Sequence, residues 1–506
     1  MGDSRQGYID SAAIRVGFEK KTLDLVSGFN SLWNGCRSAF CEDRTYERAR
    51  RLALSMLVCL GRHTISSVVC TAGRQLFDWS ADYRLFSKAV WDSDMLFDPV
   101  REGILNMLPD SVPFVTAIDD TNLRKTGKTI PGVKYTRDPM SPPFHTNFIR
   151  GQRFCQISAL LPERDGVGPA RAIPIEYQHV PPVPKPKRSA SIEDWQAYGR
   201  RCREQNLSIH AAQRIVHLRE KMDEDSAHAS RKLVTVVDGS FCNSTVLKRL
   251  PERTCLIGRI RSDAKLYFPF ETTAPSLRGR PRRYGELAPT PEQLRRDDSI
   301  PWQQVKVFAT GRLHSFHVKR LRPVFWRKAG VDKPLQVVVI RPLGYRPRKG
   351  SRTLYRQPAY LICTDPDLPL DLLVQYYVWR WDIEVNHRDE KQIIGVGQAQ
   401  VRNPKAVERV PAFAVASYAM LLLAAAQIYG TSNDSTLLPL PKWRNNSTRH
   451  RIPTQDLIRQ LRHQLWADVL NDAPVFIDHF QTHLNPHTTP KKTCPALSSA
   501  VLYAMA

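Results

Sequence analysis

Three carboxylates in the sequence have the setting that metal-dependent cleavage of phosphodiesters requires. Asp120 ends an apolar run that begins at Val112, and Asp238 ends a second apolar run that begins at Lys232. Glu384 lies in a long helical segment, about residues 370–394. Ends of neighbouring strands meet at one edge of a sheet, and a helix crossing that edge can add the third acid. Carboxylates without a Cys or His cluster suit Mg²⁺ or Mn²⁺, and two such ions can serve phosphodiester chemistry.

Glu384 shares its helix with side chains that could hold phosphates. At about 100° per residue, Tyr377, Arg380, Glu384 and Lys391 fall on one stripe about 60° wide. A phenol, a guanidinium, a carboxylate and an ammonium on one stripe favour a site that binds a metal ion and phosphates together. Ordinary surface ion pairs on the helix are the alternative. His387 lies at the edge of this stripe, and we expect it to be a solvated neighbour.

The spacing of these four residues resembles a known signature. It matches Y-(2)-R-(3)-E-(6)-K, which marks DDE transposases of the insertion-sequence family four. The segments Ile118-Asp119-Asp120-Thr121 and Val236-Val237-Asp238-Gly239-Ser240 resemble that family's two acidic strands, so the resemblance covers residues 112–430. It implies an α/β fold with a ribonuclease-H-like core, interrupted by a mostly β insertion between the second Asp and the Glu.

The resemblance also implies roles for the site residues. Asp120, Asp238 and Glu384 would be catalytic and would bind two Mg²⁺ or Mn²⁺ ions. Arg380 and Lys391 would grip DNA phosphates near the scissile bond, and Tyr377 would bind a terminal phosphate or steady the DNA end. Asp119 competes with Asp120 for the first position. Strand alternation does not decide between them, because both faces of a central strand are buried, and the family's acid-acid-Thr pattern favours Asp120.

Charge indicates the partner without reference to any family. The 506 residues include 74 Lys and Arg against 49 Asp and Glu, a net charge of +25. Such an excess is typical of proteins that bind nucleic acid, with solubility alone as the alternative. Residues 274–356 hold 20 of the basic and only 5 of the acidic residues. The basic residues that we expect to contact DNA are Arg278, Arg280, Arg282 and Arg283 in this segment, and Arg124, Lys125 and Lys128 beside Asp120.

Changes between helical and strand-like residue patterns along the chain predict its domain organisation. Helical patterns occupy both ends, and strands dominate the middle. The predicted units are a helical N-terminal domain that could bind DNA ends (1–110), the first part of the catalytic core (111–263), the basic β-rich insertion (264–357), the second part of the core with the Glu helix (358–430), and a helical C-terminal tail that could contact DNA or a second copy (431–506). An ordinary helical bundle is the alternative for the first unit.

Together these features predict a transposase that cuts the ends of an insertion sequence and joins the 3′ hydroxyls to target DNA. The alternatives are a DDE-type nuclease or host-adapted relative that cuts without joining, and a non-enzymatic DNA-binding protein. The expected partners are double-stranded DNA and a second copy of the chain in the DNA complex. We expect a bacterial cytoplasmic protein, at the nucleoid when bound to DNA. No signal-peptide pattern begins the chain, and the apolar stretch 411–430 predicts a buried helix rather than a membrane span.

Overall fold

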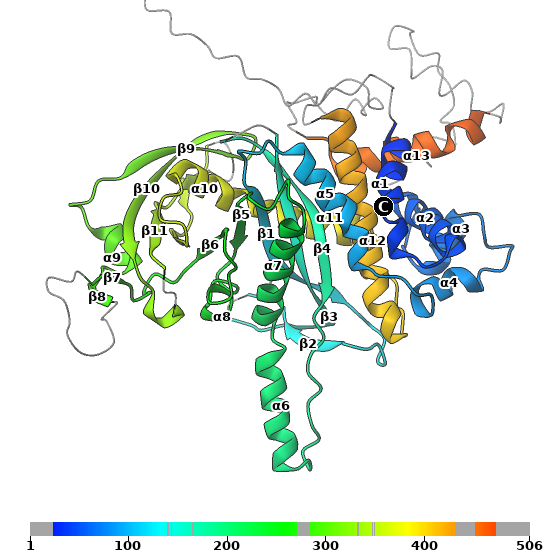
Figure 1. Cartoon of the computed structure of the whole chain (residues 1–506), viewed down its shortest axis with the longest axis horizontal. Coiled ribbons are helices and arrows are strands. Elements are labelled where there is room, and N and C mark those ends of the chain that lie inside the picture. Colours follow the sequence, from blue (N-terminus) through cyan, green and yellow to red (C-terminus); the bar gives the residue numbers. More distant parts are fainter. Residues whose placement is uncertain are drawn as a thin grey trace, which may run out of the picture.

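A ten-stranded mixed sheet lies at the centre of the protein (Figure 1). The computed structural model describes residues 24–138, 141–142, 144–163, 166–270, 284–330, 333–346, 348, 350–430 and 451–471. The strands run in the order β2-β3-β1-β5-β6-β14-β11-β10-β9, and β4 pairs with β3. Their bounds are β1 Phe114–Arg124, β2 Lys134–Arg137, β3 Phe148–Pro162, β4 Ala170–His179, β5 Leu233–Val237, β6 Thr254–Arg259, β9 Gln303–Ala309, β10 Arg312–Val324, β11 Leu335–Ile340 and β14 Ala359–Cys363.

Five of these strands form a ribonuclease-H-like core, as the sequence predicts. β1, β3 and β4 are antiparallel neighbours, whereas β5 and β6 run parallel to β1. β5 is Leu-Val-Thr-Val-Val and all five of its residues are buried. Such an apolar run is expected of a parallel strand covered on both faces. The run stops where the carboxyl end of the strand reaches the edge of the sheet, and this is where Asp238 lies.

The basic segment predicted as a β insertion does form strands. Its three long strands, β9, β10 and β11, continue the core sheet, because β11 pairs with β14. The same two layers of side chains that cover the core also cover these strands. The same segment contains smaller elements, which are β7 Tyr267–Pro269, β8 Tyr284–Leu287, α9 Pro291–Arg296, β12 Gly344–Tyr345 and β13 Leu354–Tyr355.

One face of the sheet packs against two consecutive helices, α10 (Leu370–Trp379) and α11 (Trp381–Gln392). The sequence predicts one continuous helix here. The helix is instead interrupted at Arg380, which keeps α-helical dihedral angles. The Ile383 N–H donates to the Arg380 carbonyl at 3.1 Å, and this three-residue spacing gives a tighter turn than an α-helix. α10 and α11 therefore remain nearly one rod, with Arg380 at the joint.

Helices from both ends of the chain pack on the other face and on the β4 edge (Figure 1). α12 (Pro404–Tyr429) lies among them and contacts β4, α1 and α2. It is long and apolar enough to span a membrane by composition, but most of it is buried inside the protein, as the sequence predicts. The other helices are α1 Leu25–Asn34, α2 Asp43–Val58, α3 Ile65–Thr71, α4 Ser80–Ser87, α5 Asp98–Met107, α6 Ile192–Glu204, α7 Leu207–Glu224, α8 Ser244–Leu247 and α13 Thr454–Asn471.

Candidate active site

The register of two parallel strands brings two acids together. Ile118 of β1 pairs with Val237 of β5. The next residues, Asp119 in the middle of β1 and Asp238 directly after β5, therefore lie side by side where the pairing of these two strands ends. Side chains alternate between the two faces of a strand. Ala117 packs in the layer that contains α10 and α11, and Asp119, two residues on, lies on the same face. Asp119 and Asp238 are therefore neighbours beneath α11.

Electrostatics support this position of Asp119. The pKa of its carboxyl is raised to about 6, mainly by burial and in part by the negative charge of Asp238. His387 and Arg380, both from the α10–α11 rod, act in the opposite direction. The Asp120 N–H donates to Oδ1 of Asp119 at 2.9 Å. Asp119 thus lies between the second acid and the helix that carries the third.

Asp120 lies on the opposite face of β1. It is paired across the strands with Cys155, which belongs to the layer of side chains on the far side of the sheet. Its Oδ2 is 3.2 Å from Nε of Arg153. Burial and the charge of Asp238 raise the pKa of Asp120, whereas Arg153, His387 and Lys391 lower it, so electrostatics alone do not separate the two acids. Of the two candidates for the first acid, the structure directs Asp119 toward α11 and gives Asp120 a cationic partner elsewhere.

Asp238 is held by a tight turn that follows β5. Its Oδ1 accepts hydrogen bonds from the backbone N–H of Ser240 at 2.8 Å and from its hydroxyl at 2.7 Å. The Phe241 N–H adds a longer bond of 3.3 Å to the same oxygen. Asp side chains commonly bond to the backbone in this way and so terminate a strand. The turn fixes the carboxylate, while Oδ2 takes no part in it.

The third acid and its cationic neighbours come from the α10–α11 rod. Nη2 of Arg380 is 3.1 Å from Oε1 of Glu384, so these two side chains form an ion pair across the joint. Lys391 is exposed in the last turn of α11, and its charge interacts with those of both Asp119 and Asp120. Tyr377 is half-buried on α10. The rod therefore carries Glu384, Arg380 and Lys391 along the edge where the two strands end.

The carboxylates Asp119, Asp238 and Glu384 are of the chemical type that binds a divalent metal, but the three side chains do not converge on one point. Asp119 and Asp238 offer oxygen atoms, which Mg²⁺ and Mn²⁺ prefer. Within the described residues, no three His, Cys, Asp or Glu side chains converge closely enough to hold an ion. Glu384 is instead held by Arg380. Asp119 and Asp238 thus lie side by side, whereas Glu384 is paired with Arg380.

His387 is a member of the site whose environment the sequence did not indicate. It is buried, not solvated. Its Nδ1 is 3.4 Å from Oε2 of Glu390, and among the residues that the structure describes its Nε2 has no hydrogen-bond partner. The expectation failed because α11 has a second buried side that packs on β4, and the 3.6-residue period did not reveal that side. The i, i+3 spacing of His387 and Glu390 was the signal available in the sequence.

The basic residues beside the site divide into two groups. Lys125 is buried, and its Nζ donates to the carbonyls of Gly397 at 2.8 Å and Ala399 at 2.9 Å. The predicted DNA contact of Lys125 is therefore replaced by a structural role: it ties the end of β1 to the segment after α11. Arg124 and Lys128 are exposed, and Arg124 is 3.3 Å from Asp138.

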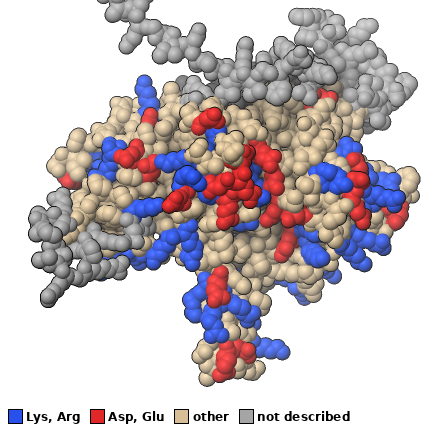
Figure 2. Space-filling view, in the orientation of Figure 1, with Lys and Arg blue, Asp and Glu red and all other residues tan. Residues whose placement is uncertain are grey.

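The arginine cluster of the insertion, Arg278, Arg280, Arg282 and Arg283, lies outside the described residues. The face of the described residues that Figure 2 shows carries both signs of charge, with a group of Asp and Glu side chains near the middle of the view. Figure 2 shows Lys and Arg side chains along the lower side of the sheet near α8 and on the projecting helix α6.

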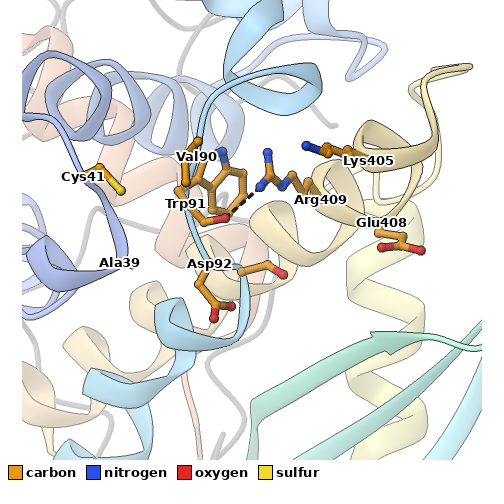
Figure 3. Close-up of a pocket in the computed structure, with 9 residues that line it drawn as sticks. Ala39, Cys41, Val90, Trp91, Asp92, Lys405, Glu408 and Arg409 are labelled. Carbon is orange, nitrogen blue, oxygen red and sulfur yellow. Dashed lines mark hydrogen bonds between the residues drawn. The ribbon is translucent and has the colours of Figure 1, made fainter.

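A separate cavity of about 450 Å³ lies between the helical domain and the start of α12 (Figure 3). Arg409 crosses it and donates to the carbonyls of Ala89 at 2.7 Å and Trp91 at 2.8 Å. None of the predicted acids lines it. Its lining residues are Ala39, Cys41, Val90, Trp91, Asp92, Ser93, Lys405, Glu408 and Arg409. The acids on β1 and β5 therefore remain the candidate active site.

A ribonuclease-H-like sheet with acids on β1 and directly after β5 defines a class of nucleases that cut DNA at a carboxylate site. Comparison with known families agrees, since residues 39–331 match the family described as DDE superfamily endonuclease. The chain belongs to this family. The match includes both acidic strands and ends before α11, so it does not reach Glu384. No curated protein matches the chain.

Membership has three consequences at this level of detail. The protein is an enzyme of the nuclease or transposase type, its substrate is DNA, and it belongs to a group of nucleases that generally use divalent metals.

Proposed function

We propose that the protein is a DNA transposase that cleaves at the ends of an insertion sequence and joins the 3′ hydroxyls to target DNA. The observation that carries the proposal is the adjacency of Asp119 and Asp238 beneath a helix that bears Arg380, Glu384 and Lys391. A simple hydrolase needs the acids alone. The cations next to them favour a site that retains the DNA end for a second reaction, in which that end becomes the nucleophile.

In this proposal Asp119, rather than Asp120, is the first catalytic acid. Asp119, Asp238 and Glu384 would hold two Mg²⁺ or Mn²⁺ ions, which would supply activation of the attacking hydroxyl and stabilisation of the leaving oxygen. When DNA enters, a phosphate can replace Glu384 as the partner of the Arg380 guanidinium, and the carboxylate of Glu384 is then free. Arg380 then neutralises the phosphate while Glu384 completes the acidic site.

The remaining predicted DNA contacts surround this centre. Lys391 would bind a phosphate next to the scissile bond, because it is exposed and close to the acids. Tyr377 would steady the DNA end. Farther away, Arg124, Lys128 and the cluster Arg278, Arg280, Arg282 and Arg283 would neutralise duplex phosphates. Joining two element ends to one target requires two active sites, so we expect a homodimer on DNA, in a bacterial cytoplasm and at the nucleoid.

Oligonucleotides that carry the roughly 100–200 base pairs flanking the coding sequence on each side test the proposal. Wild-type protein should nick at the element ends and then join the labelled 3′ end to a plasmid. Asp238→Asn and Glu384→Gln should do neither while still binding DNA. Asp365→Asn is the matched control, since Asp365 also follows a core strand but is paired with Lys232, which precedes β5 at the opposite edge of the sheet.

Three results are informative. Cleavage without joining would favour the nuclease alternative. Normal cleavage by Asp238→Asn would refute the site. Equal loss in Asp365→Asn would mean that the assay reports folding rather than catalysis.

A further inference from the structure

A short hairpin extends the sheet beyond the end of β1 and exposes aromatic rings. β2 pairs with the first residues of β3, so that Tyr135 lies opposite Arg150 and Arg137 lies opposite Phe148. Residues that lie opposite each other, and residues two apart on one strand, share a face. Tyr135, Arg137, Phe148 and Arg150 therefore occupy one face of this hairpin, at the lower edge of the sheet in Figure 1.

Two aromatic rings on this face are open to solvent. The exposed fraction is 67% for Tyr135 and 66% for Phe148. Rings of this size usually bury most of their surface, so two exposed ones on one face indicate a binding surface.

The charges around the rings are almost all positive. Residues 124–153 contain seven Lys and Arg and a single acid, Asp138. Arg150 is already engaged, because it donates to the carbonyls of Gly127 at 2.6 Å and Lys128 at 3.0 Å. Arg137 is exposed and, within the described residues, has no carboxylate partner. The hairpin face thus presents two aromatic rings and the guanidinium of Arg137 to solvent, on strands held by the β2–β3 pairing and by the hydrogen bonds of Arg150.

The hairpin lies at a definite distance from the acids. Phe148 begins β3, and Gln156, eight residues later in the same strand, pairs with Asp119. These eight steps span about 26 Å at roughly 3.3 Å per residue. At the rise of about 3.4 Å per nucleotide that one strand has in a duplex, this distance corresponds to seven or eight nucleotides.

We propose that the face formed by Tyr135, Arg137 and Phe148 binds single-stranded DNA about seven or eight nucleotides from the scissile bond. Bases stack on the two rings, and Arg137 holds a phosphate between them. Rings alternating with cations are how proteins bind single strands without reading their sequence. The positive charge favours DNA over a second copy of this chain, whose own surface is also basic. This inference rests on the proposed function, since it assumes that the acids cut DNA.

Binding without metal tests the hairpin independently of cleavage. Full-length protein is titrated with a fluorescent single-stranded 20-mer and with the same sequence as duplex, in a chelator. Tyr135→Ala and Phe148→Ala should each weaken single-strand binding about 5- to 150-fold and duplex binding less than about threefold. Tyr135→Phe should bind like the wild type, because it keeps the ring. Tyr355→Ala is the matched control, since Tyr355 is 72% exposed on the β12–β13 hairpin.

Four outcomes would overturn the proposal. These are equal losses for single strand and duplex, a loss in Tyr135→Phe as large as in Tyr135→Ala, an equal loss in the Tyr355→Ala control, or variants that change sedimentation of the free protein instead of DNA binding.

The predicted spacing is tested with a forked DNA that carries 2-aminopurine at successive positions. Stacking should change its fluorescence six to nine nucleotides from the scissile bond in the wild type but not in Tyr135→Ala. A change confined to the first three nucleotides would contradict the distance. If Asp238→Asn cleaves normally while Tyr135→Ala loses single-strand binding, the proposed function fails and the hairpin assignment stands.

Discussion

Replacing Asp119 with asparagine should separate catalysis from stability. The carboxyl is half-buried beside Asp238, and its pKa of about 6 lies above the ordinary value of 3.8. A folded-state pKa above the unfolded value means that the ionised acid destabilises the fold. This penalty is fully present above pH 6 and disappears as the pH falls toward 4. The difference corresponds to up to about 3 kcal/mol at neutral pH.

Asp119→Asn should therefore be at least as stable as the wild type at pH 7.5 in a chelator, and the stabilisation should vanish near pH 4. The same change should slow cleavage about 1,000-fold or more, because a lost metal ligand removes several kcal/mol of transition-state stabilisation. Asp120→Asn is the matched control. It removes the charge that pairs with Arg153 on the other face of β1 and should slow cleavage by less than about tenfold.

Urea denaturation and single-turnover cleavage measure the two effects. Near-normal cleavage by Asp119→Asn, with a severe loss in Asp120→Asn, would refute the placement of Asp119 and restore the assignment suggested by the acid-acid-Thr pattern. A large destabilisation of Asp119→Asn at pH 7.5 would refute the electrostatic argument.

Three further predictions concern charge and metal. Burial lowers the pKa of Lys125 to about 8, so the wild type should gain stability relative to Lys125→Met as the pH rises from 8 to 10. Equal pH profiles of the two proteins in urea denaturation would contradict this prediction. A change in the salt dependence of DNA binding by Lys125→Met would also contradict it. The second prediction concerns the insertion cluster Arg278, Arg280, Arg282 and Arg283. Substituting these four residues by Glu should flatten the plot of log K against log salt by roughly 0.9 per lost phosphate contact, equally for specific and random DNA. An unchanged slope would mean that these side chains are solvated and do not contact DNA. Cleavage should require Mg²⁺ or Mn²⁺, with Ca²⁺ supporting binding alone; full activity in a chelator would exclude a metal mechanism.

The sequence predicted the core well, because the core depends on patterns that sequence carries. An apolar run that ends in an acid is typical of a buried strand reaching a sheet edge, and two such runs located Asp238 and the Asp119–Asp120 pair. The choice within that pair depends on which face α11 covers. That is a property of helix placement, and β1 alone has no signal for it.

Other differences also arise from tertiary contacts. Lys125 looks like a solvent-exposed cation in sequence, but two carbonyls more than 270 residues away bind its ammonium. The charge of residues 264–357 suggests a separate β insertion, but β11 pairs with the free edge of β14 and so extends the core sheet. His387 is buried because α11 packs on β4 as well as over the strand ends. Each outcome depends on distant partners that local periodicity does not report.

The central claim is that Asp119 and Asp238 hold the metal that acts on DNA, and a change of ligand tests it most directly. Cysteine offers a soft sulfur that binds Mg²⁺ poorly, whereas Mn²⁺ tolerates it better. Cleavage of the element ends is measured for Asp119→Cys, Asp238→Cys and Asp120→Cys in each metal. We predict that the first two are inactive in Mg²⁺ and recover in Mn²⁺, while Asp120→Cys cleaves in both. Recovery in Mn²⁺ by Asp120→Cys alone, or equal activity of all three variants in Mg²⁺, would contradict the account.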